Sequence, residues 1–199
     1  MGKWLLGGLI AIAAVMGIWA ETFSQVYTFR GSLIDPPMPA PDFTLNNQYG
    51  QPFRMSEQRG KLVLIFFGYT NCPDVCPSTL AQFRQVRSQL GTQAERVQFV
   101  FITVDPECDT PERMKTYLGA FDQNIVGLSG PQADLQATWR DYGVYRQQQP
   151  GSSTDGYLDL IEHSARVYLL DAQGNLRLTY PNGLSGEDLL HDIQYLLKK

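Results

Sequence analysis

Residues 61–77 read KLVLIFFGYTNCPDVCP, an apolar run followed by two cysteines that stand four apart and each precede a proline. A continuous apolar run of this length is typical of a strand buried on both faces of a sheet. Beyond the second cysteine, apolar side chains recur at helical spacing, at Leu80, Phe83, Val86 and Leu90. The cysteine pair therefore falls between a buried strand and the next helix, where α/β folds commonly place their chemistry.

The rest of the chain supplies the other elements of an α/β fold. An apolar run at 97–104 (VQFVFITV) predicts a second buried strand. Turn residues between short strand patterns predict hairpins at 43–55 and 166–180, and the polar segment 147–157 is predicted as an exposed loop. Further elements are expected at 110–120 (helix), 125–128 (strand), 132–142 (helix) and 187–197 (helix). This order predicts a thioredoxin-like fold with an N-terminal β-hairpin and an inserted loop or hairpin.

Composition indicates one globular domain with an additional N-terminal segment. The chain has 199 residues, of which 43% are hydrophobic and 18% charged, and we expect a single core over residues 42–199. The 16 basic and 20 acidic residues give a net charge of -4. Because the sequence shows no cluster of Lys and Arg, nucleic acid is not an expected partner.

The N-terminal segment is apolar enough to span a bilayer. Residues 4–20 (WLLGGLIAIAAVMGIWA) carry no charge and would extend about 25 Å as a helix, near the lower limit for a span. Lys3 precedes this run and Glu21 follows it, which by the positive-inside rule sends the remainder of the chain out of the cytoplasm. We therefore predict a transmembrane anchor at 1–21. The alternatives are a signal peptide, disfavoured by a poor cleavage motif, and a buried core helix.

The connection between anchor and domain is rich in proline. Gly31 and the prolines at positions 36, 37, 39 and 41 disfavour regular structure, so residues 22–41 are predicted to be an extended linker. The predicted topology is a single-pass protein of a bacterial inner membrane with its domain in the periplasm. The mitochondrial inner membrane, facing the intermembrane space, is the second choice. Disulfides persist in an exported compartment of this kind.

Two chemistries are open to a cysteine pair at the start of a helix. Helix N-termini stabilise a thiolate, and Pro77, a residue favoured at the first helical position, predicts that Cys76 caps the helix and forms the favoured thiolate. Cys72 and Cys76 can exchange a disulfide, or they can hold a soft metal ion. Three residues separate them, against two in the usual thioredoxin-type motif, and this wider loop favours a metal without excluding a disulfide.

A metal site needs a third ligand, and the chain offers two histidines. His163 stands just before the buried strand predicted at 166–170, where thioredoxin-like proteins face their cysteine pair, so we expect it to join the cysteines. His191 lies on the last predicted helix and is interpreted as a surface residue. Two thiolates and an imidazole suit Cu(I), and also Cu(II) with a weak further ligand, whereas structural zinc prefers four protein ligands.

Three segments carry a resemblance to a known family. They are GYTNCPDVCP at 68–77, TVDPECDTP at 103–111 and the pair His163-Ser164. In this order they resemble the Sco (SenC-like) family of membrane-anchored, thioredoxin-fold copper chaperones, and the C-P-D-x-C-P segment is highly specific. The resemblance covers the chain from about residue 40 to residue 197, together with the anchor.

The resemblance implies a site and a function. Cys72, Cys76 and His163 are expected to bind copper, and Asp105 is expected to support the site or its partners, although a strand-end turn also explains this aspartate. The implied client is subunit II of cytochrome c oxidase, whose dinuclear copper (CuA) centre would receive copper, have its cysteines reduced, or both. Another periplasmic copper chaperone or a thioredoxin-like reductase is a further expected partner.

One departure from the family and three rival functions complete the prediction. Cys108 stands where the family usually has arginine, and we hypothesise that this thiol is inert and largely shielded. A thiol-disulfide oxidoreductase acting on exported cysteines is the alternative function. A peroxiredoxin-type peroxidase is disfavoured because Pro73 stands where such enzymes carry threonine. A copper sensor would need a partner that supplies the output.

Overall fold

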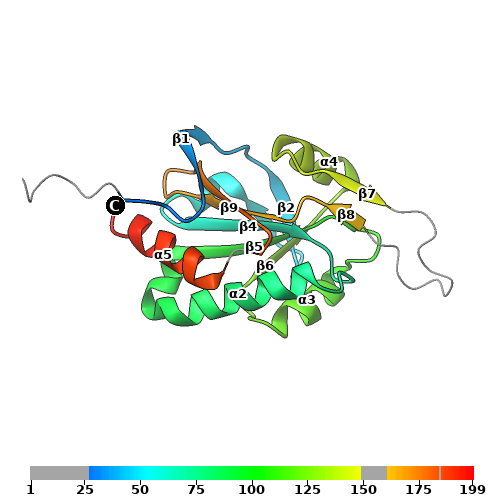
Figure 1. Ribbon diagram of the computed structural model, residues 1–199. Helices are drawn as coiled ribbons and strands as arrows, with labels where there is room; N and C mark the ends of the chain where they lie inside the picture. Colours follow the sequence, from blue (N-terminus) through cyan, green and yellow to red (C-terminus); the bar gives the residue numbers. More distant parts are fainter. Residues whose placement is uncertain (1–26, 149–160, 184) are drawn as a thin grey trace, which may run out of the picture.

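The computed structural model describes residues 27–148, 161–183 and 185–199, which form a mixed sheet with helices on both faces and a separate two-stranded arm (Figure 1). The strands are β1 (Ser32–Pro39), β2 (Thr44–Asn47), β3 (Pro52–Arg54), β4 (Leu62–Gly68), β5 (Val97–Thr103), β6 (Val126–Ser129), β7 (Arg146–Gln148), β8 (Ile161–His163), β9 (Arg166–Leu170) and β10 (Asn175–Pro181). The α-helices are α2 (Val75–Leu90), α3 (Pro111–Gly119), α4 (Gln132–Asp141) and α5 (Gly186–Leu196). Short 3-10 helices span Met55–Gln58 and Gly91–Arg96.

The main sheet has the order β1-β10-β9-β4-β5-β6-β2-β3. β4 pairs in parallel with β5 and antiparallel with β9, and every residue of β4 is buried, as its apolar run predicts. The helices α2 and α3, which connect β4 to β5 and β5 to β6, lie on one face of the sheet, and α4 lies on the other (Figure 1). The thioredoxin-like prediction is confirmed, and the ends of β4 and β5 lie side by side.

The core is built from aromatic and aliphatic side chains of the central strands and the helices that cover them. Phe66 of β4, Phe83 of α2 and Phe99 of β5 are each no more than 1% exposed. The rings of Phe83 and Phe99 pack with their centroids 5.2 Å apart. Each such side chain contributes about 1.5–3 kcal/mol when fully buried, so α2 is held firmly against the strand end that carries the cysteines.

The predicted hairpins are present, and the start of α2 is shifted. β2 and β3 form the N-terminal hairpin, and β2 also pairs with β6, so the hairpin extends the main sheet. β9 and β10 form the second hairpin. α2 begins at Val75 with Asp74 as its N-cap, whereas Pro77 predicted a later start. Cys76 therefore lies within the first helical turn and is not the cap.

β1 contradicts the prediction that residues 22–41 lack regular structure. This strand pairs antiparallel with β10 at the edge of the sheet. Its register shifts between Leu33 and Met38, the interval that holds Pro36 and Pro37. Prolines are tolerated at a bulge on an edge strand, because no ladder hydrogen bond needs their missing N–H.

The arm, defined as β7 and β8, stands apart from the main sheet. Its strands pair antiparallel and place Arg146 directly opposite His163. The sequence predicted an exposed loop over 147–157; its first two residues belong to β7 instead, and the others lie outside the described residues.

The predicted membrane anchor at 1–21 also lies outside the described residues. Among the helices of the described ranges, none combines the length and the apolar character that crossing a bilayer requires.

Candidate metal centre

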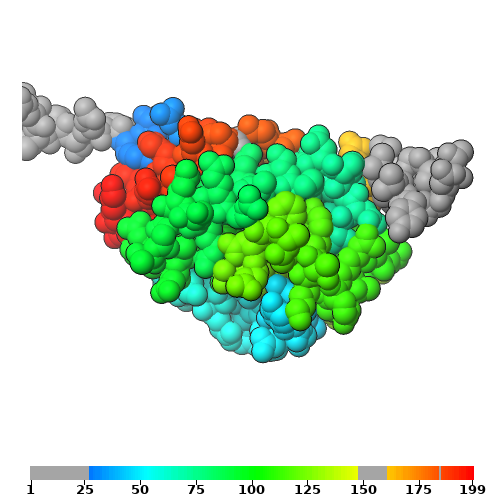
Figure 2. Space-filling model, turned by 90° about the horizontal axis from the view of Figure 1, so that it is seen from below, coloured from blue at the N-terminus to red at the C-terminus, as the bar shows by residue number. Residues whose placement is uncertain are grey.

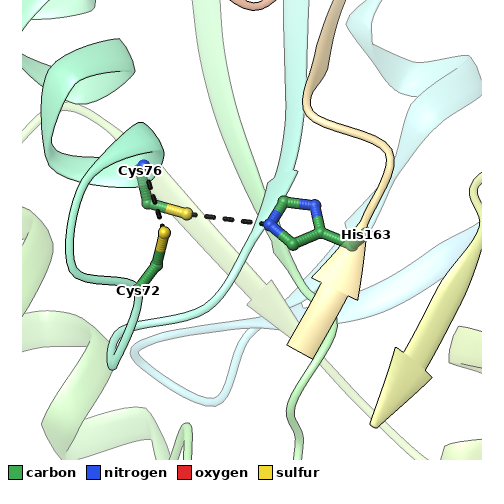
Figure 3. A group of neighbouring side chains, drawn as sticks. All are labelled: Cys72, Cys76 and His163. Atoms are coloured by element: carbon green, nitrogen blue, oxygen red, sulfur yellow. Dashed lines mark hydrogen bonds between the residues drawn. The ribbon is translucent and has the colours of Figure 1, made fainter. Parts of the chain in front are cut away.

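Cys72, Cys76 and His163 come together at the end of β4, as predicted (Figure 3). Their donor atoms all lie within 4.8 Å of one another. The Sγ atom of Cys76 is 4.0 Å from Nε2 of His163, and the Sγ atom of Cys72 accepts a 3.4 Å hydrogen bond from the backbone N–H of Cys76. Two sulfur atoms and one imidazole nitrogen thus face a common point.

The two cysteines differ in their exposure to solvent. Cys76 is fully buried, whereas Cys72 is half-buried. Gly68 makes room for the buried thiol, because a Cβ atom at this position would lie 2.8 Å from the Cys76 sulfur and 2.8 Å from the ring of Phe101. Cys76 therefore forms the floor of the site, and Cys72 its accessible rim.

The imidazole of His163 reaches the cysteines from the end of β8. Its ring lies between those of Tyr69 and Phe66, at centroid distances of 5.7 and 6.4 Å. Nε2 faces the sulfur atoms, while Nδ1 is buried and has no hydrogen-bond partner among the described residues. The aromatic contacts fix the plane of the ring, so Nε2 is the nitrogen available to a metal ion.

The paired thiols lose one proton readily and hold the other tightly, as their two pKa shifts show. Hydrogen bonding from Cys76 lowers the pKa of Cys72 to about 4, with His163 and the N–H groups at the start of α2 acting in the same direction. The same sulfur-sulfur hydrogen bond, together with burial, holds the pKa of Cys76 well above its usual range. The sequence assigned the favoured thiolate to Cys76, and this prediction was wrong, because the buried Cys76 thiol donates its hydrogen to the sulfur of Cys72, and His163 and the first-turn N–H of α2 also favour the Cys72 thiolate.

A buried carboxylate braces the loop that carries Cys72. Asp109 is 1% exposed and accepts hydrogen bonds from the backbone N–H of Thr70 at 3.1 Å and from the hydroxyls of Thr70 and Thr103 at 2.5 and 2.6 Å. Burial raises the pKa of Asp109, and these hydrogen bonds oppose the rise. Arg113 donates to the Thr70 hydroxyl at 2.7 Å and to the side chain of Asn71. The loop is thereby joined to the turn after β5 and to α3.

No individual role was predicted from the sequence for Asp109, Arg113 or Gly68. Asp109 lies inside the segment at 103–111 that carries the family resemblance, which is the signal that could have drawn attention to it. Its partners come from β4 and β5, so only the folded chain shows what it does.

The other predicted residues lie outside the cluster of three donors. Asp105 forms the turn after β5, where its carbonyl oxygen accepts from the N–H groups of Cys108 and Asp109. Cys108 is exposed, which contradicts the expectation that it is shielded; partial burial and the neighbouring Asp105 raise the pKa of its thiol. His191 lies on α5 with Nδ1 3.0 Å from the carboxylate of Asp192.

Comparison with known proteins identifies the family. A family model described as SCO1/SenC matches residues 34–198. The chain belongs to the SCO1/SenC family. The SCO2 homologue of mouse mitochondria, a relative, is 36% identical over 155 residues, which are 77% of this chain and 60% of the mouse protein. The match thus spans about three fifths of that relative, which places the SCO1/SenC domain within a longer protein there.

Solved SCO1/SenC structures have the same fold. The copper-bound structure of ScoI from Bradyrhizobium japonicum is 36% identical with a TM-score of 0.72, and the match covers 79% of this chain and 99% of that chain. The copper-bound structure of yeast Sco1 is 30% identical with a TM-score of 0.72, covering 82% and 90%. The family predicted from the three sequence segments is confirmed.

Proposed function

We propose that the protein is a copper chaperone that holds one copper ion between Cys72, Cys76 and His163. The observation that carries this proposal is the convergence of the three donor atoms within 4.8 Å. Metal bonds of about 2.3 Å to sulfur and about 2.1 Å to imidazole nitrogen place two ligands at most about 4.6 Å apart. Only a small movement would therefore close the donors on an ion. Two thiolates and an imidazole suit Cu(I), and a weak further ligand would admit Cu(II).

The protonation of the pair sets an order for binding. Cys72 is a thiolate at neutral pH, because its pKa lies at about 4, and its exposure lets it contact an incoming ion first. Cys76 is still protonated and loses its proton to solvent when the ion binds. Copper binding at neutral pH is therefore expected to release about one proton per site. During delivery, a copper ligand of the client protein would approach the ion from the side of Cys72.

The proposed client is the CuA site of cytochrome c oxidase subunit II. Membership of the SCO1/SenC family supports this client. The apolar N-terminal sequence supports a single-pass anchor at 1–21, with the domain in the periplasm of a bacterium. In that position the chaperone and the exported face of a membrane-bound oxidase would share one compartment.

A copper titration of the chain tests the proposed site. We expect one tight equivalent, measured by competition for Cu(I) and by absorption for Cu(II), and a loss of at least about tenfold in affinity for each of Cys72→Ala, Cys76→Ala and His163→Ala. Cys108→Ala and His191→Ala are matched controls, since they remove the same donor types outside the cluster. Equal affinity in the site variants and the controls would contradict the proposal.

A thiol-disulfide oxidoreductase is the second candidate, favoured by the low pKa and accessibility of Cys72. Its thiolate would attack a client disulfide, and Cys76 would then displace the client. The Cys72 thiolate and the Cys76 thiol become a disulfide, two electrons and the proton of Cys76 pass to the client's sulfurs, and solvent supplies the second proton. His163→Ala separates the roles, because exchange needs only the cysteines. A variant that retains exchange and loses copper would show that the two activities are independent.

A further inference from the structure

The donors of the proposed copper site belong to two parts of the fold. The cysteines follow β4 in the main sheet, whereas His163 ends the arm, whose strands pair with each other. An isolated two-stranded ribbon such as the arm, of which three residues in each strand are described, is only marginally stable by itself. Two residues join His163 to β9 of the main sheet, and side chains that contact the main sheet hold the rest of the arm in place.

One residue contacts both parts. The N–H of Val104, just after β5, donates to the carbonyl oxygen of Gly68, where the cysteine loop begins, at 2.8 Å. The carbonyl oxygen of Val104 accepts a hydrogen bond of 2.5 Å from Nε of Arg146 in β7. Arg146 stands opposite His163 in the register of the arm. Val104 thus connects the start of the loop that carries Cys72, through its backbone N–H, to the side chain of Arg146 in the strand that pairs with His163.

The guanidinium of Arg146 is also held by an aromatic ring. It lies over the ring of Trp139 on α4, 5.6 Å from the centroid, within the range of a cation–π contact. The indole N–H of Trp139 donates to the carbonyl oxygen of Thr103 at 3.1 Å, so the ring is fixed to the residue that precedes Val104. Arg146 is therefore seated between the end of β5 and α4.

We infer that Arg146 is a positioning residue, which fastens the arm to the end of β5 and thereby fixes the distance between His163 and the cysteine pair. This inference rests on the proposed copper site. Arg146 does not contact copper; it acts through the strand that pairs with the histidine. Without Arg146, the arm keeps its backbone pairing and its buried Ile161. The arm is then less firmly held, so the imidazole of His163 must be brought into position each time an ion binds, at a cost in conformational entropy. The copper affinity contributed by His163 falls accordingly.

The test compares Arg146→Met with Arg140→Met, a matched control on α4. Both substitutions remove one positive charge and keep an unbranched side chain, and the Arg140 side chain is 74% exposed, paired with the adjacent Asp141. Each variant is made with His163 present and with His163→Ala. The measurements are copper affinity by chelator competition and the nitrogen hyperfine coupling of bound Cu(II) by electron paramagnetic resonance.

We expect Arg146→Met to weaken copper binding about tenfold when His163 is present, the lower end of the range for supporting residues of metal sites. With His163→Ala, the same substitution should change affinity less than twofold. The hyperfine coupling from nitrogen should become weaker or heterogeneous in Arg146→Met and remain unchanged in Arg140→Met. Arg146→Gln provides the same comparison if the methionine variant fails to fold.

The outcomes separate this inference from the proposed function. If His163→Ala leaves copper affinity unchanged, the three-donor site itself is wrong. If His163→Ala weakens binding while Arg146→Met and Arg146→Gln behave like Arg140→Met, the site stands and the positioning role is refuted. An equal loss with and without His163 would also refute it, because Arg146 would then act on overall folding.

Discussion

At the scale of single residues, position 68 admits no side chain beyond hydrogen. We expect Gly68→Ala to push the Cys76 sulfur or the Phe101 ring aside, because the added Cβ would lie 2.8 Å from each. Such overpacking costs about 1–3 kcal/mol of unfolding free energy, and copper affinity should fall as well. Gly119→Ala is the control, since a Cβ there meets nothing within 4 Å. Urea unfolding and a copper titration of both variants measure the difference; equal behaviour would show that the Cys76 pocket yields without cost.

The half-buried thiol of Cys72 should ionise at lower pH than the exposed thiol of Cys108. The pKa of Cys72 is lowered to about 4, so its thiolate predominates at pH 6, whereas the raised pKa of Cys108 keeps that thiol protonated. A thiol with a pKa of about 8.5 or more is less than about 1% ionised at pH 6. The weaker nucleophilicity of a low-pKa thiolate offsets about a hundredfold of this advantage.

We therefore expect iodoacetamide to modify Cys72 several-fold faster than Cys108 at pH 6. The ratio of the two rates should fall as the pH rises to 9, because Cys108 then ionises. Peptide mass spectrometry over a time course measures both rates in one sample. Faster modification of Cys108 at pH 6 would contradict the assignment of the thiolate and the hypothesis that Cys108 is inert.

At the scale of elements, Asp109 joins the loop after β4 to the end of β5, and Arg113 of α3 contacts the same loop. The hydroxyl of Thr70 donates to one carboxylate oxygen of Asp109 and the hydroxyl of Thr103 to the other, so in Asp109→Asn one of these two hydroxyls faces an amide donor in place of its acceptor. A buried group left with mismatched partners costs about 1–3 kcal/mol, and the loop of Cys72 should loosen with it. The control is Asp141→Asn, where the carboxylate is partly exposed and pairs with a neighbouring arginine. Urea midpoints and copper affinity report the two effects; an unchanged midpoint in Asp109→Asn would mean that the threonine hydroxyls reorient freely.

The same scale shows what sequence can predict about the fold. β4 and the following strand β5 were predictable because both faces of each are buried, which leaves a continuous apolar run. β1 was missed because its prolines, at a register shift on the sheet edge, remove the local signal of a strand. β7 is polar and pairs with β8 across residues 149–160, so its strand character depends on a distant partner.

The three clustered donor residues were predictable from the sequence, whereas the residues that support them were not. Cys72 and Cys76 were found from their spacing and position after β4, and His163 from its place before β9. The assignment of the thiolate to Cys72 depends on the burial of Cys76 and on its hydrogen bond to Cys72, which no local sequence pattern records. The support from Arg146 depends on the backbone carbonyl of Val104, just after β5, and no local pattern records such a contact.

At the scale of the whole molecule, the first described residues are fastened at the end opposite to the arm. Figures 1 and 2 show the arm at one end of the molecule and α5 with the C-terminus at the other. There Asp192, which is fully buried, accepts hydrogen bonds from the N–H groups of Arg30 and Gly31 and from the hydroxyl of Tyr180. The proposed copper site therefore lies at the end of the domain opposite to the point where the described chain begins.

This attachment predicts where the stable domain begins. A chain of residues 42–199 loses β1 and leaves the buried carboxylate of Asp192 without its backbone donors, and an uncompensated buried charge costs about 3–5 kcal/mol. We therefore expect residues 27–199 to unfold at clearly higher urea concentration than residues 42–199. Asp192→Asn should lower the free energy of unfolding by about 1–3 kcal/mol in the longer chain. The loss should be smaller in the shorter chain, where the charge of Asp192 is already poorly compensated. Equal midpoints for the two chains would restore a domain boundary at residue 42, and an equal effect of Asp192→Asn in both would show that the backbone donors do not stabilise the carboxylate.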